Sequence, residues 1–300
     1  MSTPNPVAHP LLGPTVVGTE VRVDLMLQQP TRITAFLADI TLQRFILDRL
    51  FDSNGGVQGG AVVYDQATEN ELYLDRDVAR IAPGSEFPVV TSTRRAPRVA
   101  EVEKWGGKFW FSDEARDRND AAAFRNEATR LGNTIVRKLN ARAIEVLNAA
   151  IAANAGLSEF VGNDWSAAIP NGSAPTAPAL TPGADFARAQ LLADQRELGI
   201  TFNIALVNPV QLTELRLFYG GGLGQMLEDN GIDEIYASNR VPVGTAYFVA
   251  EGALGELRLE QPLATETWRE PERQRTWVQS SVRPVMFVTN PFAVLRATGL

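Results

Sequence analysis

Neighbouring carboxylates are the residues of this chain best suited to chemistry. Two adjacent carboxyls can serve as a general acid–base pair or hold a hard cation. Adjacent acids at helix starts and loop tips are more often solvated, or lie favourably at the positive end of a helix dipole. We therefore expect these pairs to be surface groups and not a catalytic centre. The three pairs are Asp113/Glu114, Glu228/Asp229 and Asp233/Glu234.

Other reactive groups are sparse. The single histidine, His9, lies in a proline-rich segment, so a Ser-His-Asp triad has no credible base. The chain contains no cysteine, which excludes disulfides, thiolate metal sites and cysteine nucleophiles. The glycine run at residues 220–224 follows a predicted helix and lacks a subsequent Lys-Ser/Thr, so it does not fit a phosphate loop. The sequence therefore predicts no catalytic residue, no cofactor and no metal site.

The overall charge and hydropathy exclude two further classes of protein. The formal net charge of −7 argues against a dedicated nucleic-acid reader, because such proteins normally present a basic surface. An acidic shell that encloses nucleic acid without reading it remains compatible with this charge. No stretch approaches the ~20 apolar residues of a membrane helix, so no membrane partner is expected.

Charge is unevenly distributed between two segments. Residues 57–90 hold six acids and two arginines, a net charge of −4, whereas residues 130–142 hold four bases and no acid, a net charge of +4. Two solvated faces would explain this pattern. The alternative hypothesis is that the acidic segment of one subunit lies over the basic segment of the next, which would set register more than stability. The residues assigned to this contact are Asp65, Glu69, Glu71, Asp75, Asp77, Arg130, Arg137, Lys138 and Arg142.

The basic segment belongs to the longest predicted helix, residues 120–153. Apolar residues recur there at steps of three and four from Phe124 to Ile151, which places them on one face of a helix. Asn119 or Asp120 can cap its first turn. At 1.5 Å per residue the helix is roughly 50 Å long, so it needs a partner along its whole length.

Before this helix the sequence predicts extended structure. Residues 1–30 hold five prolines and little periodicity, which is typical of an arm that is ordered by a neighbour. A helical pattern follows at residues 33–52. Residues 61–64 and 71–74 are predicted to pair as a hairpin. Residues 98–103 and 108–111 are predicted to form a second strand pair, turned at Trp105-Gly106-Gly107.

After the long helix, the pattern predicts a compact unit of mixed helices and strands. Helices are expected from Thr181-Pro182 to Leu198 and from Asn208-Pro209 to Phe218, since a cap followed by proline marks a helix start. Strands are expected at residues 202–207, 235–237, 247–250, 278–288 and 293–297. The fold class is therefore α+β.

Four passages resemble one known family. They are residues 82–88 (APGSEFP), residues 102–107 (VEKWGG) leading to 111–114 (FSDE), residues 240–247 (RVPVGTAY), and residues 283–288 with 290–294 (RPVMFV, NPFAV). In this order they resemble the major capsid proteins of tailed bacteriophages with the Hong Kong 97-type fold. The resemblance implies an N-terminal arm at residues 1–52, an extended β-hairpin loop at 53–93, a peripheral domain with a long spine helix at 94–153 and 269–300, and an axial domain at 154–268.

The same resemblance implies a structural protein and not an enzyme. The expected function is a major capsid protein that self-assembles into hexamers and pentamers of an icosahedral shell enclosing packaged double-stranded DNA. The expected location is the virion, after synthesis and assembly in the host cytoplasm. The expected partners are other copies of the chain, a portal, a separate scaffolding protein, and DNA that is enclosed without sequence-specific binding; the sequence leaves open whether a decoration protein binds outside. The arm starts almost at Met1, so a separate scaffold is expected unless the sequence has already been trimmed.

The chain departs from the family in its lysines. Some members crosslink a lysine of the extended loop to an asparagine of a neighbour. Here the only lysines are Lys104, Lys108 and Lys138, all outside residues 53–93. We therefore expect no such crosslink, and a covalent ladder in denaturing electrophoresis of particles would contradict this expectation.

A glycine inside the predicted long helix has two interpretations. Gly132 costs the helix about 1 kcal/mol relative to alanine. The glycine either allows a neighbouring element to pack closely or provides a bend point that is used when an immature shell expands.

Two alternative functions remain open from the sequence. An encapsulin-type nanocompartment shell would share the fold but enclose a cargo enzyme and no DNA. A soluble two-domain enzyme would use the acidic pairs and form a monomer or small oligomer. The missing base, nucleophile and phosphate loop count against the enzyme.

Overall fold

A computed structural model describes residues 23–42, 47–53, 55–67, 78–89, 97–154, 156–197 and 199–300 of the chain. Several sequence predictions lie outside these residues. They are residues 1–22 and 43–46 of the N-terminal arm, with His9, the strand at residues 71–74, and the loop acids Glu69, Glu71, Asp75 and Asp77.

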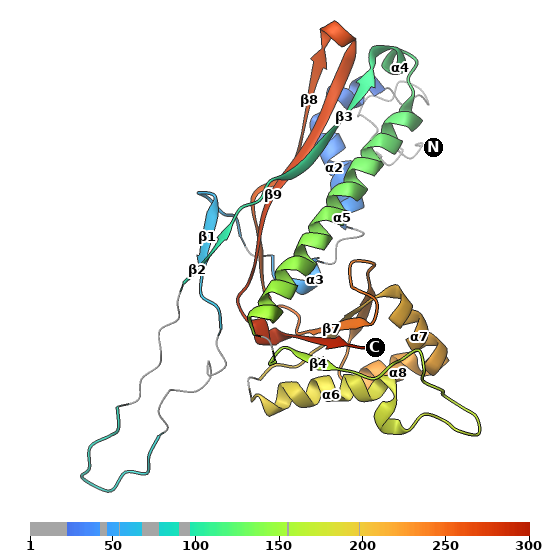
Figure 1. Cartoon of the computed structure of the whole chain (residues 1–300). Coiled ribbons are helices and arrows are strands. Elements are labelled where there is room, and N and C mark those ends of the chain that lie inside the picture. Colours follow the sequence, from blue (N-terminus) through green and yellow to red (C-terminus); the bar gives the residue numbers. More distant parts are fainter. Residues whose placement is uncertain are drawn as a thin grey trace, which may run out of the picture.

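The upper body in Figure 1 is a long antiparallel sheet with helices on one face. Its strand order is β3 (Trp105–Ser112), β9 (Arg275–Val288) and β8 (Gly255–Glu270). Helix α5 (Ala121–Ala153) runs along the sheet, and α2 (Pro30–Leu42) lies beside it. Three short helices complete this body, α1 (Val23–Leu27), α3 (Leu47–Leu50) and α4 (Asp113–Asp117).

The lower body is a five-stranded mixed sheet. Its strand order is β4 (Glu159–Val161), β10 (Val294–Thr298), β7 (Thr245–Val249), β5 (Ile204–Val207) and β6 (Glu234–Ala237). The helices of this body are α6 (Pro182–Gln195), α7 (Pro209–Tyr219) and α8 (Leu223–Asp229). Short 3₁₀ turns lie at Pro178–Leu180, Gly220–Gly222, Pro271–Arg273 and Pro291–Ala293.

The long helix is confirmed. α5 starts after Asp120, whose carboxylate accepts a hydrogen bond from the Ala123 amide at 3.0 Å, and its predicted apolar stripe is buried except for Leu131, which is partly buried. The upper part of α5 packs through Phe124 against Phe111 of β3, with ring centroids 5.7 Å apart. Its lower part joins the main core around the five-stranded sheet. The predicted partner along its whole length is therefore supplied by both bodies.

Local signals also predicted the helix and strand starts of the lower body. Asn208 caps α7 by accepting from the Val210 amide at 3.0 Å, and Pro209 occupies the first helical turn. β5 is buried at every position. The structure ends α6 at Gln195, three residues before the predicted Leu198, which lies outside the described residues. The Thr181 hydroxyl donates back to the Pro178 carbonyl at 2.8 Å and does not cap α6.

One predicted strand pairing before α5 is wrong, and another is untested. Residues 61–64 form a strand, β1 (Ala61–Tyr64), which pairs antiparallel with β2 (Arg98–Glu101); its predicted partner, residues 71–74, lies outside the described residues. The predicted partner of residues 98–103 was the strand at 108–111, yet β3 pairs with β9 along its full length. The error arose because two strands near in sequence were paired, whereas the hydrogen-bonded partner of β3 is distant in sequence.

Trp105-Gly106-Gly107 is consequently not a turn but the start of β3. A Cβ on Gly106 would lie 2.5 Å from the Ser280 carbonyl oxygen, and one on Gly107 would lie 2.8 Å from Leu131 Cδ1. The first glycine lets β3 approach β9, and the second lets α5 pack on β3. Close backbone approach is the reason for glycine within a strand here.

The longest strand, β8, was missed by the sequence patterns. It contains Pro262, and its register against β9 shifts twice, between Leu259 and Gln261 and between Gln261 and Ala264. These irregularities break the period of two that identifies strands in a sequence. Pairing with β9 along most of that strand's length therefore decides the conformation of β8.

Candidate assembly surfaces

The base of the loop between β1 and β2 is fixed to the long sheet. The Val102 amide donates to the Gly60 carbonyl at 2.9 Å, and the Glu103 amide donates to the Pro284 carbonyl of β9 at 3.0 Å. The Tyr64 and Phe287 rings lie 4.8 Å apart. A small buried cluster of valines and Phe287 closes this base. The loop therefore leaves from a firm support.

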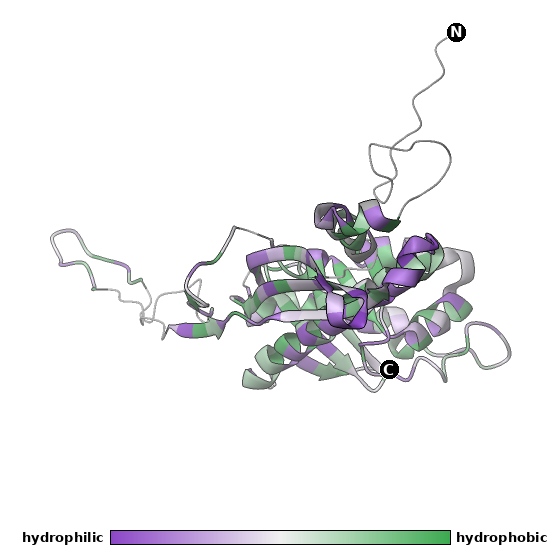
Figure 2. Ribbon diagram, turned by 90° about the horizontal axis from the view of Figure 1, so that it is seen from above, coloured by the Kyte–Doolittle hydropathy of each residue, from purple (hydrophilic) through white to green (hydrophobic). Residues whose placement is uncertain are grey.

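Residues 78–89 of the loop contain a turn. The Ser85 amide donates to the Ala82 carbonyl at 3.0 Å, and Gly84 has φ +82°. Proline at the second and glycine at the third position are what a type II turn requires. Phe87 is 78% exposed and Val89 71% exposed, and in Figures 1 and 2 the segment lies away from both bodies. An exposed aromatic segment of this kind is typical of an interaction site.

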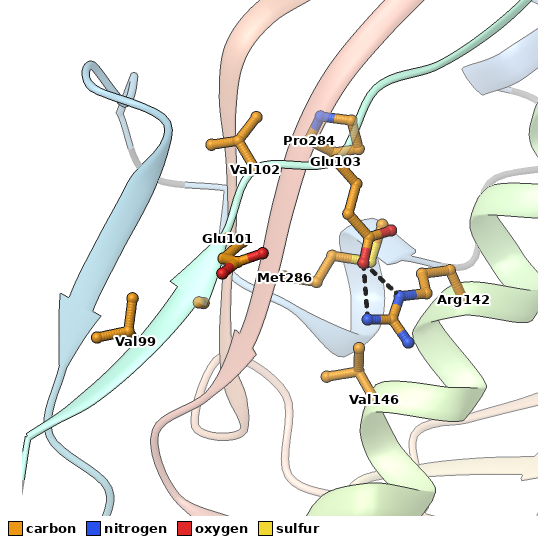
Figure 3. Close-up of a pocket in the computed structure, with 9 residues that line it drawn as sticks. Val99, Glu101, Val102, Glu103, Arg142, Val146, Pro284 and Met286 are labelled. Carbon is orange, nitrogen blue, oxygen red and sulfur yellow. Dashed lines mark hydrogen bonds and ion pairs between the residues drawn. The ribbon is translucent and has the colours of Figure 1, made fainter.

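Two of the four predicted helix cations already have acidic partners in the same chain. Arg142 contacts Glu103 Oε1 through Nη2 at 2.7 Å and Nε at 2.8 Å, and it reaches Glu145 at 3.2 Å (Figure 3). The Glu103 carboxylate raises the pKa of the Arg142 guanidinium. Arg130 pairs with Glu127 at 2.7 Å. The acidic partners therefore offset part of the net charge of +4 counted for residues 130–142.

The other two cations, Arg137 and Lys138, are exposed and form no ion pair with another described residue. On the acidic side, Asp65 lies exposed directly after β1. The structure does not bring Asp65 and these cations together by any described ion pair. The remaining four loop acids lie outside the described residues, so contact between the two segments stays a prediction.

A cavity of about 310 Å³ opens beside the Arg142–Glu103 pair, where β2, β9 and α5 meet (Figure 3). Valines, Pro284 and Met286 supply much of its lining. Of its charged lining groups, Arg142 and Glu103 are engaged with each other, and Glu101 is exposed.

One acid of each candidate pair forms a hydrogen bond or ion pair within the chain. Asp113 accepts from Arg269 Nη2 at 2.6 Å and pairs with Arg116 at 3.3 Å. The hydrogen bond from Arg269 lowers the pKa of the Asp113 carboxyl. Asp229 accepts from Gln225 at 2.8 Å, and Glu234 accepts from the Tyr236 hydroxyl. Across the described ranges, no three His, Cys, Asp or Glu residues gather as a metal site, and no described helix is long and apolar enough to span a membrane.

Gly132 is buried within α5, and the helix continues through it without interruption. The structure thus places a residue without a side chain on the packed side of the long helix. Its use as a bend point remains a prediction.

A surface that sequence patterns missed is a row of three tryptophans. Trp110 of β3 and Trp268 of β8 each lie directly opposite Trp277 of β9. The individual residues are visible in the sequence, but their common row depends on the register of three strands. The only local signal was the period of two around residues 275–282.

The chain matches known proteins at the levels of family and fold. A family model described as phage capsid protein matches residues 95–297. No curated protein matches the chain.

Three similar solved structures illustrate the fold. A virus-like particle from Pyrococcus furiosus has a TM-score of 0.62 and 14% identity, covering 88% of this chain and 97% of that chain. A chain from Mycobacterium phage Bobi has a TM-score of 0.58 and 14% identity, covering 86% and 89%. The mature capsid of bacteriophage PhiM1 has a TM-score of 0.57 and 14% identity, covering 85% and 88%.

Proposed function

Because the chain belongs to the phage capsid protein family, we propose that it is the major capsid protein of a virion, closing hexamers and pentamers into an icosahedral shell around packaged double-stranded DNA. The observation that supports this proposal most is the loop between β1 and β2. Its base is fixed to the sheet, while Phe87 and Val89 are exposed. Contacts with sibling copies would bury these side chains, and many weak contacts per subunit add up in a closed assembly.

Electron microscopy of the purified protein tests the proposal. Closed shells that form from this chain alone or with a scaffold are the expected result. A compact monomer under all assembly conditions would contradict it. The contents of particles from the native source separate the two kinds of shell, since packaged DNA supports the virion and a single cargo protein would indicate a nanocompartment.

The proposal includes partners and location. We propose that the shell assembles in the host cytoplasm around a separate scaffolding protein and incorporates a portal. The enclosed DNA is held without sequence-specific contacts, which is consistent with the net charge of −7. The role is structural and not enzymatic.

We also propose a division of the chain that follows the family pattern. Residues 1–52 form the arm, 53–93 the extended loop, 94–153 and 269–300 the peripheral domain, and 154–268 the axial domain. The sheet topology supports two refinements. β8 pairs with β9, which favours a peripheral segment that starts at Gly255, and β10 lies in the five-stranded sheet, which favours its assignment to the axial domain.

The charge-pairing contact can be tested on its two exposed cations. Reversal of both, Arg137→Glu with Lys138→Glu, is expected to slow assembly about tenfold at low salt, because steering between opposite charges is lost. The neutral pair Arg137→Gln with Lys138→Gln is the matched control and should show a smaller effect. Light scattering at ~0.05 M and ~0.5 M salt measures the rate, since added salt screens surface charges. Equal slowing at both salt concentrations would argue against the contact.

The bend-point role of Gly132 predicts a kinetic effect. Gly132→Ala favours a straight helix by about 1 kcal/mol and should slow expansion of an immature shell about fivefold or more. Time-resolved small-angle scattering measures the expansion. Gly221→Ala, where an added Cβ meets nothing within 4 Å, is the control. Unchanged expansion kinetics for Gly132→Ala would remove the proposal.

A further inference from the structure

Gln211 of α7 is a buried polar side chain with an unpaired acceptor. It is 2% exposed, and its Oε1 accepts no hydrogen bond from any described residue. Its Nε2 lies 3.4 Å from Glu214 Oε2, which is longer than an ordinary N–H···O hydrogen bond. A buried acceptor without a partner costs the free energy of its desolvation. The surroundings of this amide therefore favour a further group that interacts with oxygen.

Glu214, on the next turn of α7, is a partly buried carboxylate near a second carboxylate. No described arginine or lysine forms an ion pair with it. Burial raises the pKa of the Glu214 carboxyl, and the charge of Asp164 raises this pKa further, whereas the hydrogen bond from Gln211 lowers it. Neighbouring like charges destabilise the ionised form of each carboxyl. A cation bound between Asp164 and Glu214 would remove this repulsion.

Asp164, in the loop after β4, is held in place by the residues on either side of it. Asp185 in the first turn of α6 accepts from the Asn163 amide at 2.9 Å and from Trp165 Nε1 at 2.8 Å. Asp164 Oδ1 accepts from the Ser166 hydroxyl at 2.6 Å and from the Ser166 amide at 3.0 Å. These hydrogen bonds lower the pKa of the Asp164 carboxyl. Asp164 therefore stays ionised, and its Oδ2 accepts no hydrogen bond from a described residue.

The loop after β4 and helix α7 are both fixed to the same turn of α6. The Gly183 amide in that turn donates to the Tyr219 hydroxyl at the end of α7 at 2.7 Å, and Asp185 in that turn holds the loop. This common attachment explains why the charge of Asp164 reaches Glu214 although the two residues are distant in sequence. The oxygens of a loop and of a helix are thereby brought to one place.

The three side chains supply the oxygen ligands that hard divalent cations prefer. Calcium accepts about six to eight oxygens in flexible geometry, including carboxylates and glutamine carbonyls, whereas magnesium requires near-octahedral geometry and keeps several waters. A loop carboxylate combined with a helix carboxylate and an amide therefore suits calcium better. The last torsion of a glutamine side chain rotates easily, so the oxygen of Gln211 can face a cation beside Glu214.

We propose that Asp164, Gln211 and Glu214 bind one calcium ion through Asp164 Oδ2, the Glu214 carboxylate and the Gln211 amide oxygen, with water completing the coordination. The ion joins the loop after β4 to α7 and stiffens the lower body. Three protein ligands predict a weak site with a Kd of about 10⁻⁴ to 10⁻³ M. Sequence patterns gave no sign of this site, because its ligands form no motif of fixed spacing. The site lies within a single chain, so it does not depend on self-assembly.

Terbium luminescence tests the site on the unassembled full chain. Terbium occupies calcium sites and emits when a nearby tryptophan is excited, and Trp165 directly follows Asp164. The wild type should give sensitised emission, and Asp164→Asn and Glu214→Gln should each weaken terbium binding at least tenfold. The matched control neutralises an exposed acidic pair at the end of α8, Glu228→Gln with Asp229→Asn, and should leave the emission unchanged. Wild-type binding in both site variants, or equal loss in the control, would overturn the proposal.

Competition and a third variant identify the ion and the role of the amide. Calcium should displace terbium at least tenfold more effectively than magnesium, and equal displacement would overturn the choice of calcium. Gln211→Met keeps a side chain of similar length without the amide and should weaken terbium binding about fivefold. Circular dichroism shows whether this variant is folded. Unchanged binding in folded Gln211→Met would show that the amide is not a ligand and would overturn the three-residue site.

Urea unfolding provides a readout that does not use terbium. Calcium should raise the urea midpoint of the wild type, because a ligand that binds only the folded state stabilises it, and it should not raise the midpoint of Glu214→Gln. In the presence of a chelator, Asp164→Asn and the wild type should unfold at the same midpoint. An equal rise with calcium in the wild type and in Glu214→Gln would overturn the site. Shell formation is measured separately, so failure of the calcium site leaves the proposed function unaffected.

Discussion

Gly106→Ala should destabilise the protein by about 3 kcal/mol, the upper part of the usual range for overpacked sites. The added Cβ would lie 2.5 Å from the Ser280 carbonyl oxygen and 2.9 Å from Ser281 Cα. Both atoms belong to the backbone of β9, so no side-chain rotation can relieve the clash. β3 must move away from β9, and the hydrogen bonds that join the two strands weaken.

Two other glycines give a graded comparison. Gly107→Ala meets only the end of the Leu131 side chain at 2.8 Å, which can rotate, so a loss of about 1 kcal/mol is expected. Gly221→Ala meets nothing within 4 Å and should be close to neutral. Urea unfolding of the unassembled chain measures all three. Equal stability of Gly106→Ala and Gly221→Ala would show that β3 does not approach β9 this closely.

Asp185→Ala should cost about 3 kcal/mol of unfolding free energy, because it leaves one buried donor on Trp165 and two partly buried donors on Asn163 without an acceptor. The Asp185 carboxylate is 1% exposed and accepts from Trp165 Nε1 at 2.8 Å, from the Asn163 amide at 2.9 Å and from Asn163 Nδ2 at 3.0 Å. It ties the loop after β4 to the first turn of α6. Trp165, itself 2% exposed, stacks on Phe186 in the core. Loss of the carboxylate therefore loosens a large buried aromatic.

Asp185→Asn separates shape from charge. The amide keeps the volume and one acceptor, so a smaller loss of about 1–2 kcal/mol is expected at neutral pH. Urea unfolding with tryptophan fluorescence measures both variants. Asp164→Ala is a suitable control, since Asp164 is exposed and bonds only its own loop, at the Ser166 and Ala167 amides and the Ser166 hydroxyl. Equal stability of Asp185→Ala and Asp164→Ala would show that the hydrogen bonds of Asp185 do not hold the loop after β4 to α6.

The stability difference between the wild type and Asp185→Asn is expected to change with pH in one direction. Burial raises the pKa of the Asp185 carboxyl above its usual value, against the lowering effect of its hydrogen-bond donors. Between the unfolded-state pKa, about 3.9, and the higher folded-state pKa, the folded chain binds more protons than the unfolded chain. The stability of the wild type relative to Asp185→Asn should therefore fall as the pH rises through this window. A difference that grows with pH would contradict the raised pKa.

Local patterns in the sequence determined several elements of this protein. The apolar stripe and Asp120 predicted α5 almost to the residue, and Asn208-Pro209 predicted the start of α7. The buried run at β5 predicted a central strand. These predictions succeed because helix period, capping and full burial of a short strand depend on residues within a few positions of one another. The order of such elements, with four short passages, was enough to indicate the capsid family.

Only the tertiary structure decided which strands pair. β3 pairs with β9 from the far end of the chain, whereas proximity in sequence had predicted pairing with residues 98–103, part of which forms β2 and pairs with β1. β8 depends on β9 for its conformation, since Pro262 and two register shifts hide its pattern. The ion pair of Arg142 with Glu103 and the row of Trp110, Trp277 and Trp268 have the same origin. Strand pairing and side-chain contacts join residues that are distant in the chain. The interactions that decide them therefore produce no periodic pattern in the local sequence.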